Sequence, residues 1–525
     1  MTLKTNIGAE QRPLDFIFIS VFWATTNSNF HRPSNMKYIY RIGIFLFTLF
    51  LVHPVSAIGF PRHPLQMTDG KSSFDSLHRY IDRMIDDSTF SSCFFGIKIV
   101  SVNDGRILYE RNPEKLFHPA SNAKLFTTAT ALHILDSTFR CKTEFSIDGK
   151  INKHILRGNF VLKGFGDPLF TTDDLDSIVT VLKKKGITTI KGNLIGNESY
   201  FDDVPWGRGW MWDDEPDPDE AFISPLTIND NAIDMIVSPA QQKGMPPSIQ
   251  FKPQTSQCRI INNGVTTNDT SLPPLHVTRK RGENTFEITG RIEPRSLPQK
   301  FSFSVYQPSM FALRLLKERL QTNGITVTGS LLLDSMTSSV SHAVEFFHPI
   351  DSVIHRINKE SDNIAAENIL KILGAEYFHT MGSTESGLQV VREYLYQEVI
   401  DTSAITLVDG SGVSFYNAVT PNTIVGLLIK QHQSQRTFTR FYESLPIAGI
   451  DGTLHYRMRG TTAEGNVHAK TGSLTGVSAL SGYATTKSGT LLAFSFLSEY
   501  FPKDIGLLRN LQDRMLEFLT SFREK

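Results

Sequence analysis

The two ends of this 525-residue chain predict the same kinds of element, and this feature constrains the fold most strongly. Each end has two strand-like segments joined by a short turn, together with one amphipathic helix. The strand segments are 94–101 with 106–112 and 477–486 with 490–498, and the helices are 73–87 and 504–522. We therefore expect one sheet contributed by both ends and covered by helices, which is an α/β (α+β) fold. The C-terminal helix is expected to pack on this sheet rather than on a membrane surface.

The middle of the chain has a different pattern. Residues 175–196 and 312–334 share an amphipathic helix, a Gly-Ile-Thr sequence and a strand that follows a second glycine. This is a weak internal repeat. Between the two copies, about 228–305 is rich in Pro, Asn and Thr and contains β-like runs such as FEITGRIE (286–293). We interpret the pattern as an insertion within an insertion, in which a β-rich module interrupts the segment that contains the repeat.

Residues 36–57 have the form of a secretory signal. A short basic region is followed by an apolar run over 42–52 and by small residues at 55–57. The apolar run is short for a membrane span, and the alternative interpretation is a buried hydrophobic helix. The 35 residues before Met36 interrupt the usual arrangement. We expect that translation starts at Met36, that 1–35 is a non-native extension and that the protein is exported to the periplasm or otherwise out of the cytoplasm.

Charge and cysteine content exclude some classes of function. Lys+Arg and Asp+Glu both total 53, so no basic excess favours nucleic acid as a partner. The three cysteines, Cys93, Cys141 and Cys258, allow at most one disulfide. Their spacings match no zinc site, and the chain has no His-Glu-x-x-His pair, so a metal hydrolase is not favoured.

Residues 118–132, HPASNAKLFTTATAL, place Ser121 and Lys124 three positions apart where an apolar helix is expected to begin. On a helix this spacing puts both side chains on one face. A serine and a lysine within hydrogen-bond reach can act as a nucleophile and its base. The alternative is an N-cap serine followed by a solvated lysine.

A second candidate is Ser361-Asp362-Asn363, at the start of a helix expected within 357–374. Gly374 suits the C-terminus of that helix. Ser and Asn are also common helix caps, which is the alternative interpretation. The expected apolar face consists of Ala365, Ile369, Ile372 and Leu373.

The third candidate is Lys470-Thr471-Gly472-Ser473, where a strand pattern begins within 467–484. It supplies a cation and backbone amides at a sheet edge. A lone Lys-Thr-Gly is more often a charge on an edge strand.

Together, the three candidates are more specific than any one alone. Ser-x-x-Lys, Ser-x-Asn and Lys-Thr-Gly, in this order, form the signature of penicillin-binding proteins and serine β-lactamases. From about residue 75 to the C-terminus, the chain resembles the D-alanyl-D-alanine carboxypeptidase/endopeptidases of the class C low-molecular-mass penicillin-binding proteins. A large insertion between the first two motifs is the hallmark of that group, and here 240 residues separate Ser121 from Ser361. The resemblance is carried by 157–170, 196–203, 224–233, 409–421 and 445–461.

The resemblance implies a penicillin-binding-protein/serine β-lactamase-like domain with two nested inserted domains. It also implies the organisation that the repeat suggests. The expected divisions are a catalytic domain over 73–142 and 347–525, inserted domain II over 143–227 and 306–346, and a nested β-rich domain III over 228–305.

The resemblance also implies the role of each site residue. Ser121 is the expected nucleophile, and Lys124 is the base that takes its proton. Ser361 would pass a proton to the leaving amine, and Asn363 would bind the substrate amide. Lys470 would be the second cation that lowers the pKa of Lys124. The oxyanion hole would use the amides of Ser121 and Ser473. Lys470, Thr471 and Gly472 would form the edge that binds the terminal carboxylate, and Trp212 and Asp214 would meet the amine of a diaminopimelate side chain.

The expected substrates are peptidoglycan stem peptides, with β-lactams as inhibitors, no cofactor and no metal. The alternatives are a serine β-lactamase or esterase, and an inactive wall-binding scaffold that keeps the fold.

Overall fold

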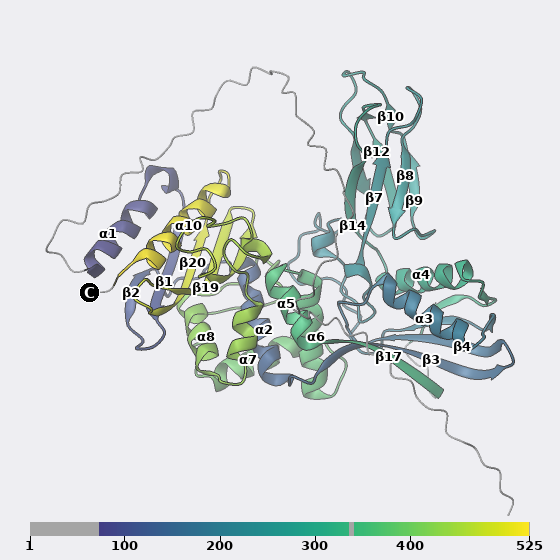
Figure 1. The fold of residues 1–525 in the computed structure, drawn as a ribbon, viewed down its shortest axis with the longest axis horizontal. Helices are drawn as coiled ribbons and strands as arrows, with labels where there is room; N and C mark the ends of the chain where they lie inside the picture. Colours follow the sequence, from purple (N-terminus) through teal and green to yellow (C-terminus); the bar gives the residue numbers. More distant parts are fainter. Residues whose placement is uncertain (1–72, 335–340, 524–525) are drawn as a thin grey trace, which may run out of the picture.

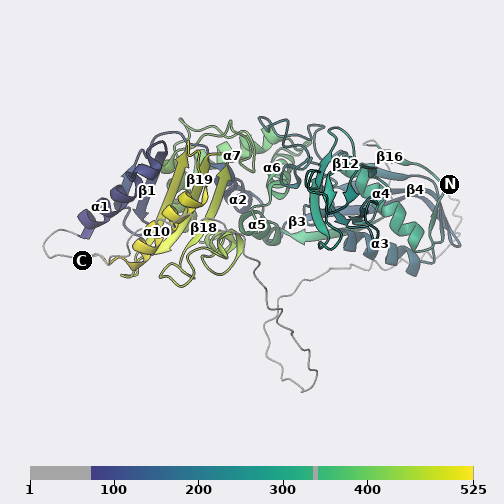
Figure 2. The same cartoon turned by 90° about the horizontal axis from the view of Figure 1, so that it is seen from above.

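The structure is a computed structural model that describes residues 73–334 and 341–523 (Figure 1). The predicted extension 1–35 and signal 36–57 lie outside the described residues. The molecule is elongated: one sheet with its helices forms one end, a second sheet forms the other end, and a β-rich module projects from the middle (Figures 1 and 2). Within the described ranges, no helix is both long and apolar enough to cross a lipid bilayer.

The first sheet joins the two ends of the chain, as the sequence predicts. All four of its strand pairs are antiparallel. The two ends meet where β1 pairs with β20, from Phe94 opposite Glu499 to Ser101 opposite Leu492. The spatial order is β18 (His468–Leu474), β19 (Val477–Thr485), β20 (Leu491–Glu499), β1 (Phe94–Ser101) and β2 (Ile107–Arg111).

Helices cover both faces of this sheet. The strands alternate in the usual way, so that Phe494 and Phe496 belong to the core formed with α1 (Ser73–Ile85) and α10 (Gly506–Ser521). On the opposite face, Ala493 and Leu497 belong to the core formed with the remaining helices of this end. The apolar face of the C-terminal helix is buried, and it consists of Leu508, Leu511, Met515, Leu519 and Phe522. The remaining helices are α2 (Ala123–Ile134), α5 (Ile350–Lys359), α6 (Asn363–Phe378), α7 (Thr384–Gln397), α8 (Pro421–Gln433) and α9 (Phe438–Ser444).

Helix α6 differs from the prediction at its C-terminus. It continues past Gly374 to Phe378, and His379 in the left-handed conformation follows it. Gly374 has another role: a Cβ there would lie 2.8 Å from the backbone nitrogen of Gly387 in α7 and closer still to Ser386 Oγ. The glycine therefore allows α6 and α7 to approach closely, and it does not mark a helix end.

The second sheet contains the internal repeat. The two copies lie side by side, because β15 pairs in parallel with β5 and β16 pairs in parallel with β6. Their helices, α3 and α4, also contact each other. The elements are α3 (Thr172–Lys184), α4 (Pro308–Thr322), β3 (Arg140–Asn152), β4 (Ile155–Gly164), β5 (Thr189–Lys191), β6 (Leu194–Asn197), β15 (Thr326–Val327), β16 (Leu331–Leu333) and β17 (Ser341–Pro349).

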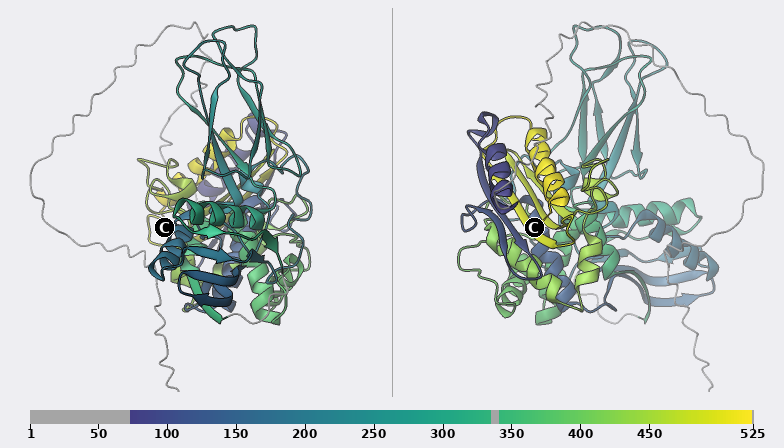
Figure 3. Two further views of the ribbon diagram at one scale, coloured as in Figure 1. Left: turned by 90° about the vertical axis from the view of Figure 1, so that its right-hand side faces the viewer. Right: turned by 60° about the vertical axis from the view of Figure 1, so that its left-hand side comes forward.

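The β-rich module is one continuous segment of the chain that projects from the part containing the second sheet (Figure 3). Its two ends lie together, since Val305 N donates a hydrogen bond to Asn231 O at 2.8 Å. Its strands are β7 (Ala232–Ser238), β8 (Ser248–Lys252), β9 (Arg259–Asn262), β10 (Val265–Thr266), β11 (His276–Arg279), β12 (Thr285–Thr289), β13 (Arg291–Ile292) and β14 (Gln299–Ser304).

The three cysteines, Cys93, Cys141 and Cys258, are free thiols in the structure. Burial raises the pKa of the Cys93 thiol to about 12, so this thiol is protonated at neutral pH.

Candidate active site

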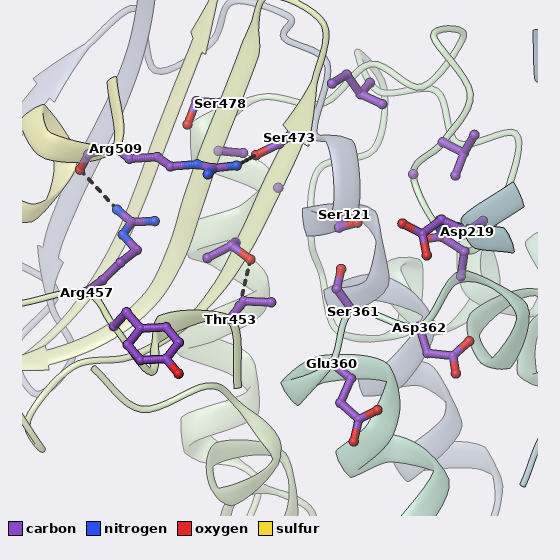
Figure 4. Close-up of a pocket in the computed structure, with 18 of the residues that line it drawn as sticks. Ser121, Asp219, Glu360, Ser361, Asp362, Thr453, Arg457, Ser473, Ser478 and Arg509 are labelled. Carbon is purple, nitrogen blue, oxygen red and sulfur yellow. Dashed lines mark hydrogen bonds between the residues drawn. The ribbon is translucent and has the colours of Figure 1, made fainter. Parts of the chain in front are cut away.

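A cavity of about 1200 Å³ lies between the edge strand β18, the turn before α2, the start of α6 and the segment 218–220 (Figure 4). All three sequence motifs contribute to its lining, although their residues are hundreds of positions apart in the chain. Ser121, Ser361 and Thr471 line it directly.

Ser121 lies in a short 3-10 turn, Ala120–Asn122, that leads directly into α2. Lys124 is completely buried, and its Nζ lies 3.0 Å from Ser121 Oγ. The N-cap of α2 is Asn122, so Ser121 does not cap the helix. The interpretation as a cap with a solvated lysine is therefore wrong for this pair.

Lys124 Nζ has two further contacts. It lies 2.6 Å from the backbone oxygen of Ser411 and 2.5 Å from Asn363 Oδ1. Burial lowers the pKa of Lys124 to about 8, although Asp409 and Glu367 act in the opposite direction. A fraction of the amine is therefore neutral near neutral pH.

In the second motif, the middle residue takes the capping role. Asp362 Oδ1 accepts a hydrogen bond from Ala365 N at 2.8 Å and caps α6. Ser361 and Asn363 are thus left for other contacts. Ser361 has a φ of 65°, which is uncommon for a residue other than glycine, and Asn363 Nδ2 donates to the backbone oxygen of Asp219 at 2.8 Å.

The third motif contains a second buried lysine. Lys470 is 0% exposed, and its Nζ donates to Ser361 Oγ at 2.8 Å and to Thr471 O at 3.0 Å. Burial, followed by the charge of Lys124, lowers the pKa of Lys470 well below its usual range. The interpretation as a solvated edge-strand charge is therefore wrong. Burial is the main cause that lowers the pKa of both lysines.

Gly472 lets strand β18 lie against the turn that carries Ser121. A Cβ at Gly472 would lie 2.8 Å from Pro119 O and 3.1 Å from Ala120 Cβ. The close approach brings Ser473 and Ser121 to the same cavity. Thr471 also lines it, with its Oγ1 donating to Thr453 Oγ1 at 2.8 Å.

Trp212 and Asp214 do not line this cavity. Trp212 is 70% exposed, and its ring stacks against the guanidinium of Arg281 with 3.4 Å between ring centroid and Cζ. Asp214 closes its own turn by accepting a hydrogen bond from Met211 N at 3.0 Å. The same loop reaches the cavity through Pro218, Asp219 and Glu220 instead.

Several residues near the site were not singled out by the sequence motifs. Glu367 is completely buried, and its Oε1 accepts hydrogen bonds from Gly410 N at 3.0 Å and Ser411 N at 2.8 Å. Its spacing from Asn363 places both on one face of α6, but no local pattern indicates which backbone it contacts. Asp409 accepts a bond from the buried Trp210 Nε1 at 3.0 Å and so links the inserted segment to this turn.

A comparison with known families matches residues 77–522 to the D-Ala-D-Ala carboxypeptidase 3 (S13) family. The chain belongs to this family. It is a D-Ala-D-Ala carboxypeptidase of the penicillin-binding, serine peptidase type, as the sequence motifs predict. Within the described residues, no group of three or more His, Cys, Asp or Glu could hold a metal ion.

Individual relatives agree with the family assignment. The D-alanyl-D-alanine carboxypeptidase of Actinomadura sp. (strain R39) is 33% identical over 437 residues, which cover 80% of each chain. D-alanyl-D-alanine carboxypeptidase DacB of Haemophilus influenzae is 29% identical, over 77% of this chain and 85% of that protein. Penicillin binding protein 4 (DacB) of H. influenzae has the same fold, with a TM-score of 0.75 at 24% identity over 85% of this chain and 99% of that one. A second structure of that protein contains a β-lactam, at a TM-score of 0.70 and 23% identity over 85% of this chain and 99% of that one.

Proposed function

We propose that this chain removes the terminal D-alanine from peptidoglycan stem peptides through an acyl-enzyme on Ser121, and that penicillins acylate the same serine. The observation that carries the proposal is a pair of lysine–hydroxyl contacts at one cavity, Lys124 with Ser121 and Lys470 with Ser361. A serine hydroxyl is a poor nucleophile until a base takes its proton, and buried lysines with lowered pKa values are suitable bases.

In the first step, Ser121 Oγ attacks the carbonyl carbon of the penultimate D-alanine and its proton passes to neutral Lys124. The neutral amine has two N–H bonds and one lone pair. Asn363 Oδ1 and Ser411 O can each accept a hydrogen bond from one of these N–H groups. The lone pair then points toward the hydroxyl of Ser121 and can accept its proton. The contacts thus favour the orientation in which Lys124 acts as a base.

In the second step, the C–N bond breaks and the terminal D-alanine leaves as an amine. Its nitrogen takes a proton from the Ser361 hydroxyl, and the contact with Lys470 provides a route for replacing that proton. Water then attacks the ester carbonyl and gives a proton to the Ser361–Lys470 pair, while protonated Lys124 returns its proton to Ser121 Oγ as the ester C–O bond breaks. The backbone amides of Ser121 and Ser473 would stabilise the oxyanion; losing one such donor typically costs about 10²–10³ in rate.

Asn363 is proposed to bind the substrate amide. Its Nδ2 donates a hydrogen bond to the backbone oxygen of Asp219, and a substrate carbonyl bound there would replace that acceptor. Binding near Asn363 therefore involves the inserted segment 218–220 as well as the catalytic motifs.

Export fits this substrate, because peptidoglycan lies outside the cytoplasm. The predicted signal at 36–57 is the feature of the chain that supports export. We propose that the mature enzyme begins close to Ile58.

A fluorescent penicillin tests the proposal against both alternatives. The purified mature chain should form a covalent adduct that persists for many minutes and that depends on Ser121. Rapid release of the label with ring-opened product would indicate a β-lactamase, and absence of labelling in a folded sample would indicate a non-catalytic scaffold. Either of those results would contradict the proposal.

A further inference from the structure

The proposed substrate ends in a carboxylate, and the lysine expected to bind it is not available. Lys470 is completely buried, and its Nζ is engaged by Ser361 and by the backbone of Thr471. Burial, and after it the charge of Lys124, lowers the pKa of this amine. Lys470 does not line the cavity, so a cation that does is better placed to pair with the carboxylate.

Two of the arginines that line the cavity are already paired with carboxylates. Arg356 Nε lies 2.6 Å from Asp362 Oδ2, and its Nη2 lies 2.5 Å from Asp230 Oδ2. Arg457 Nη2 lies 2.6 Å from Asp513 Oδ1. A further anion would have to compete with these carboxylates.

A third arginine, Arg459, is held away from the catalytic motifs. Its Nε donates to the backbone oxygen of His455 at 2.8 Å, and its guanidinium stacks on the ring of Tyr456 at 4.7 Å. It lines the same cavity and is a cation, but it contacts neither Ser473 nor Thr471 in the structure.

The remaining arginine, Arg509, lies beside the third motif. It is an exposed residue in the first turn of α10, and its Nη2 donates to Ser473 Oγ at 3.2 Å (Figure 4). Among the described residues, no carboxylate lies within ion-pair distance of its guanidinium. Ser473 connects it to the strand edge where the substrate is expected.

We propose that Arg509 binds the C-terminal carboxylate of the substrate, together with the hydroxyls of Ser473 and Thr471. This inference rests on the proposed function and names the cation of its carboxylate subsite. The planar guanidinium presents paired N–H donors that match the two oxygens of a carboxylate. Figure 4 shows Arg509 reaching along the sheet to Ser473, with Ser121 across the cavity. A carboxylate held there would orient the adjoining peptide bond toward Ser121.

The test compares two substrates: an N-acylated peptide ending in D-Ala-D-Ala with a free carboxylate, and the same peptide as a C-terminal amide. In Arg509→Gln, kcat/KM for the free carboxylate should fall about 10–100-fold, whereas the value for the amide should change less than about threefold. Arg459→Gln is the matched control and should leave both values within about threefold. Arg509→Lys should recover part of the loss, because it restores the positive charge but not the paired N–H donors of the guanidinium.

A binding measurement separates recognition from chemistry. In Ser121→Ala, which cannot form the acyl-enzyme, adding Arg509→Gln should weaken binding of the free carboxylate peptide about tenfold or more and leave the amide unchanged. Equal losses on both peptides, or no loss on either, would overturn the assignment of Arg509. If the unmodified enzyme neither hydrolyses the free peptide nor is labelled by penicillin, the proposed function fails and this subsite fails with it. An active enzyme that shows equal losses overturns the subsite alone.

Discussion

Lys124 has to meet two requirements that conflict in water. A base must be neutral to accept a proton, whereas an exposed lysine is almost entirely charged at neutral pH. Complete burial lowers its pKa to about 8. Three protein oxygens within hydrogen-bond distance of the amine take the place of water. The sequence predicted the contact with Ser121 from spacing alone. It could not predict the contact with Ser411 O, because that backbone oxygen approaches only through tertiary structure.

Lys124→Ala should slow acylation by labelled penicillin about 10²–10⁴-fold, the range expected for a positioned proton-transfer group. The measurement is the second-order rate constant for adduct formation, with circular dichroism to confirm folding. A near-normal rate would assign the base role to another group, and Lys470 would be the first candidate.

The pH dependence of acylation should follow the neutral form of Lys124. Below its pKa of about 8, the neutral fraction falls tenfold per pH unit, so the rate constant should rise with pH and level off above about 8. The acidic groups that act on Lys124 are Asp409, Glu367, Asp362 and Glu220, and each raises its pKa. A rate constant that is independent of pH between 6 and 8 would contradict the role of Lys124.

Glu367→Gln tests this electrostatic coupling. Burial raises the pKa of Glu367 to about 7, so the carboxylate is mostly charged where Lys124 titrates. The amide keeps an oxygen that can accept from Gly410 N and Ser411 N but removes the negative charge. The midpoint of the acylation profile should therefore move to lower pH. A midpoint that stays fixed or moves upward would show that Glu367 has only a structural role.

At the scale of elements, the sequence placed all three motifs in the right local context. Periodicity and turn residues were enough for the hairpins, for the terminal helices and for the repeat, because each depends on local pattern. The C-terminus of α6 was misjudged, since glycine at 374 serves a contact with α7 that no local pattern reveals. Asp362 likewise took the capping role that was considered for its neighbours.

Gly374→Val should destabilise the protein by about 1–3 kcal/mol, because the added side chain would clash with Gly387 and Ser386 in α7. Gly426→Ala in α8 is the matched control. Its Cβ would meet nothing closer than 4.0 Å, so alanine there should be neutral or slightly stabilising. Urea unfolding of both variants measures the difference. Equal stability of the two variants would contradict the close α6–α7 contact.

At the scale of the whole molecule, we propose the nested division in which 143–227 and 306–346 interrupt the catalytic part and 228–305 interrupts that insertion. The adjacent ends of the β-rich module at Asn231 and Val305 support this division. The expected role of Trp212 and Asp214 depended on how a loop folds over the cavity. That arrangement is set by long-range contacts such as Trp210 with Asp409, which spacing in the sequence does not reveal.

The mature chain should begin close to Ile58, because the small residues at 55–57 form the expected cleavage site. A chain shortened to start at Met36 should be exported at least as well as the full one, since its basic region then stands at the N-terminus. N-terminal sequencing of the exported protein checks both statements. An exported protein that retains 1–35 would refute this assignment.

The central claim is that Ser121 forms the acyl-enzyme, and peptide mapping of the penicillin adduct tests it most directly. Digestion of the labelled protein, followed by mass spectrometry, should place one adduct on the peptide that contains Ser121. Ser121→Ala should give no adduct and release no D-alanine, while its thermal unfolding stays close to that of the unmodified enzyme. An adduct on Ser361, or labelling that persists in Ser121→Ala, would contradict the account.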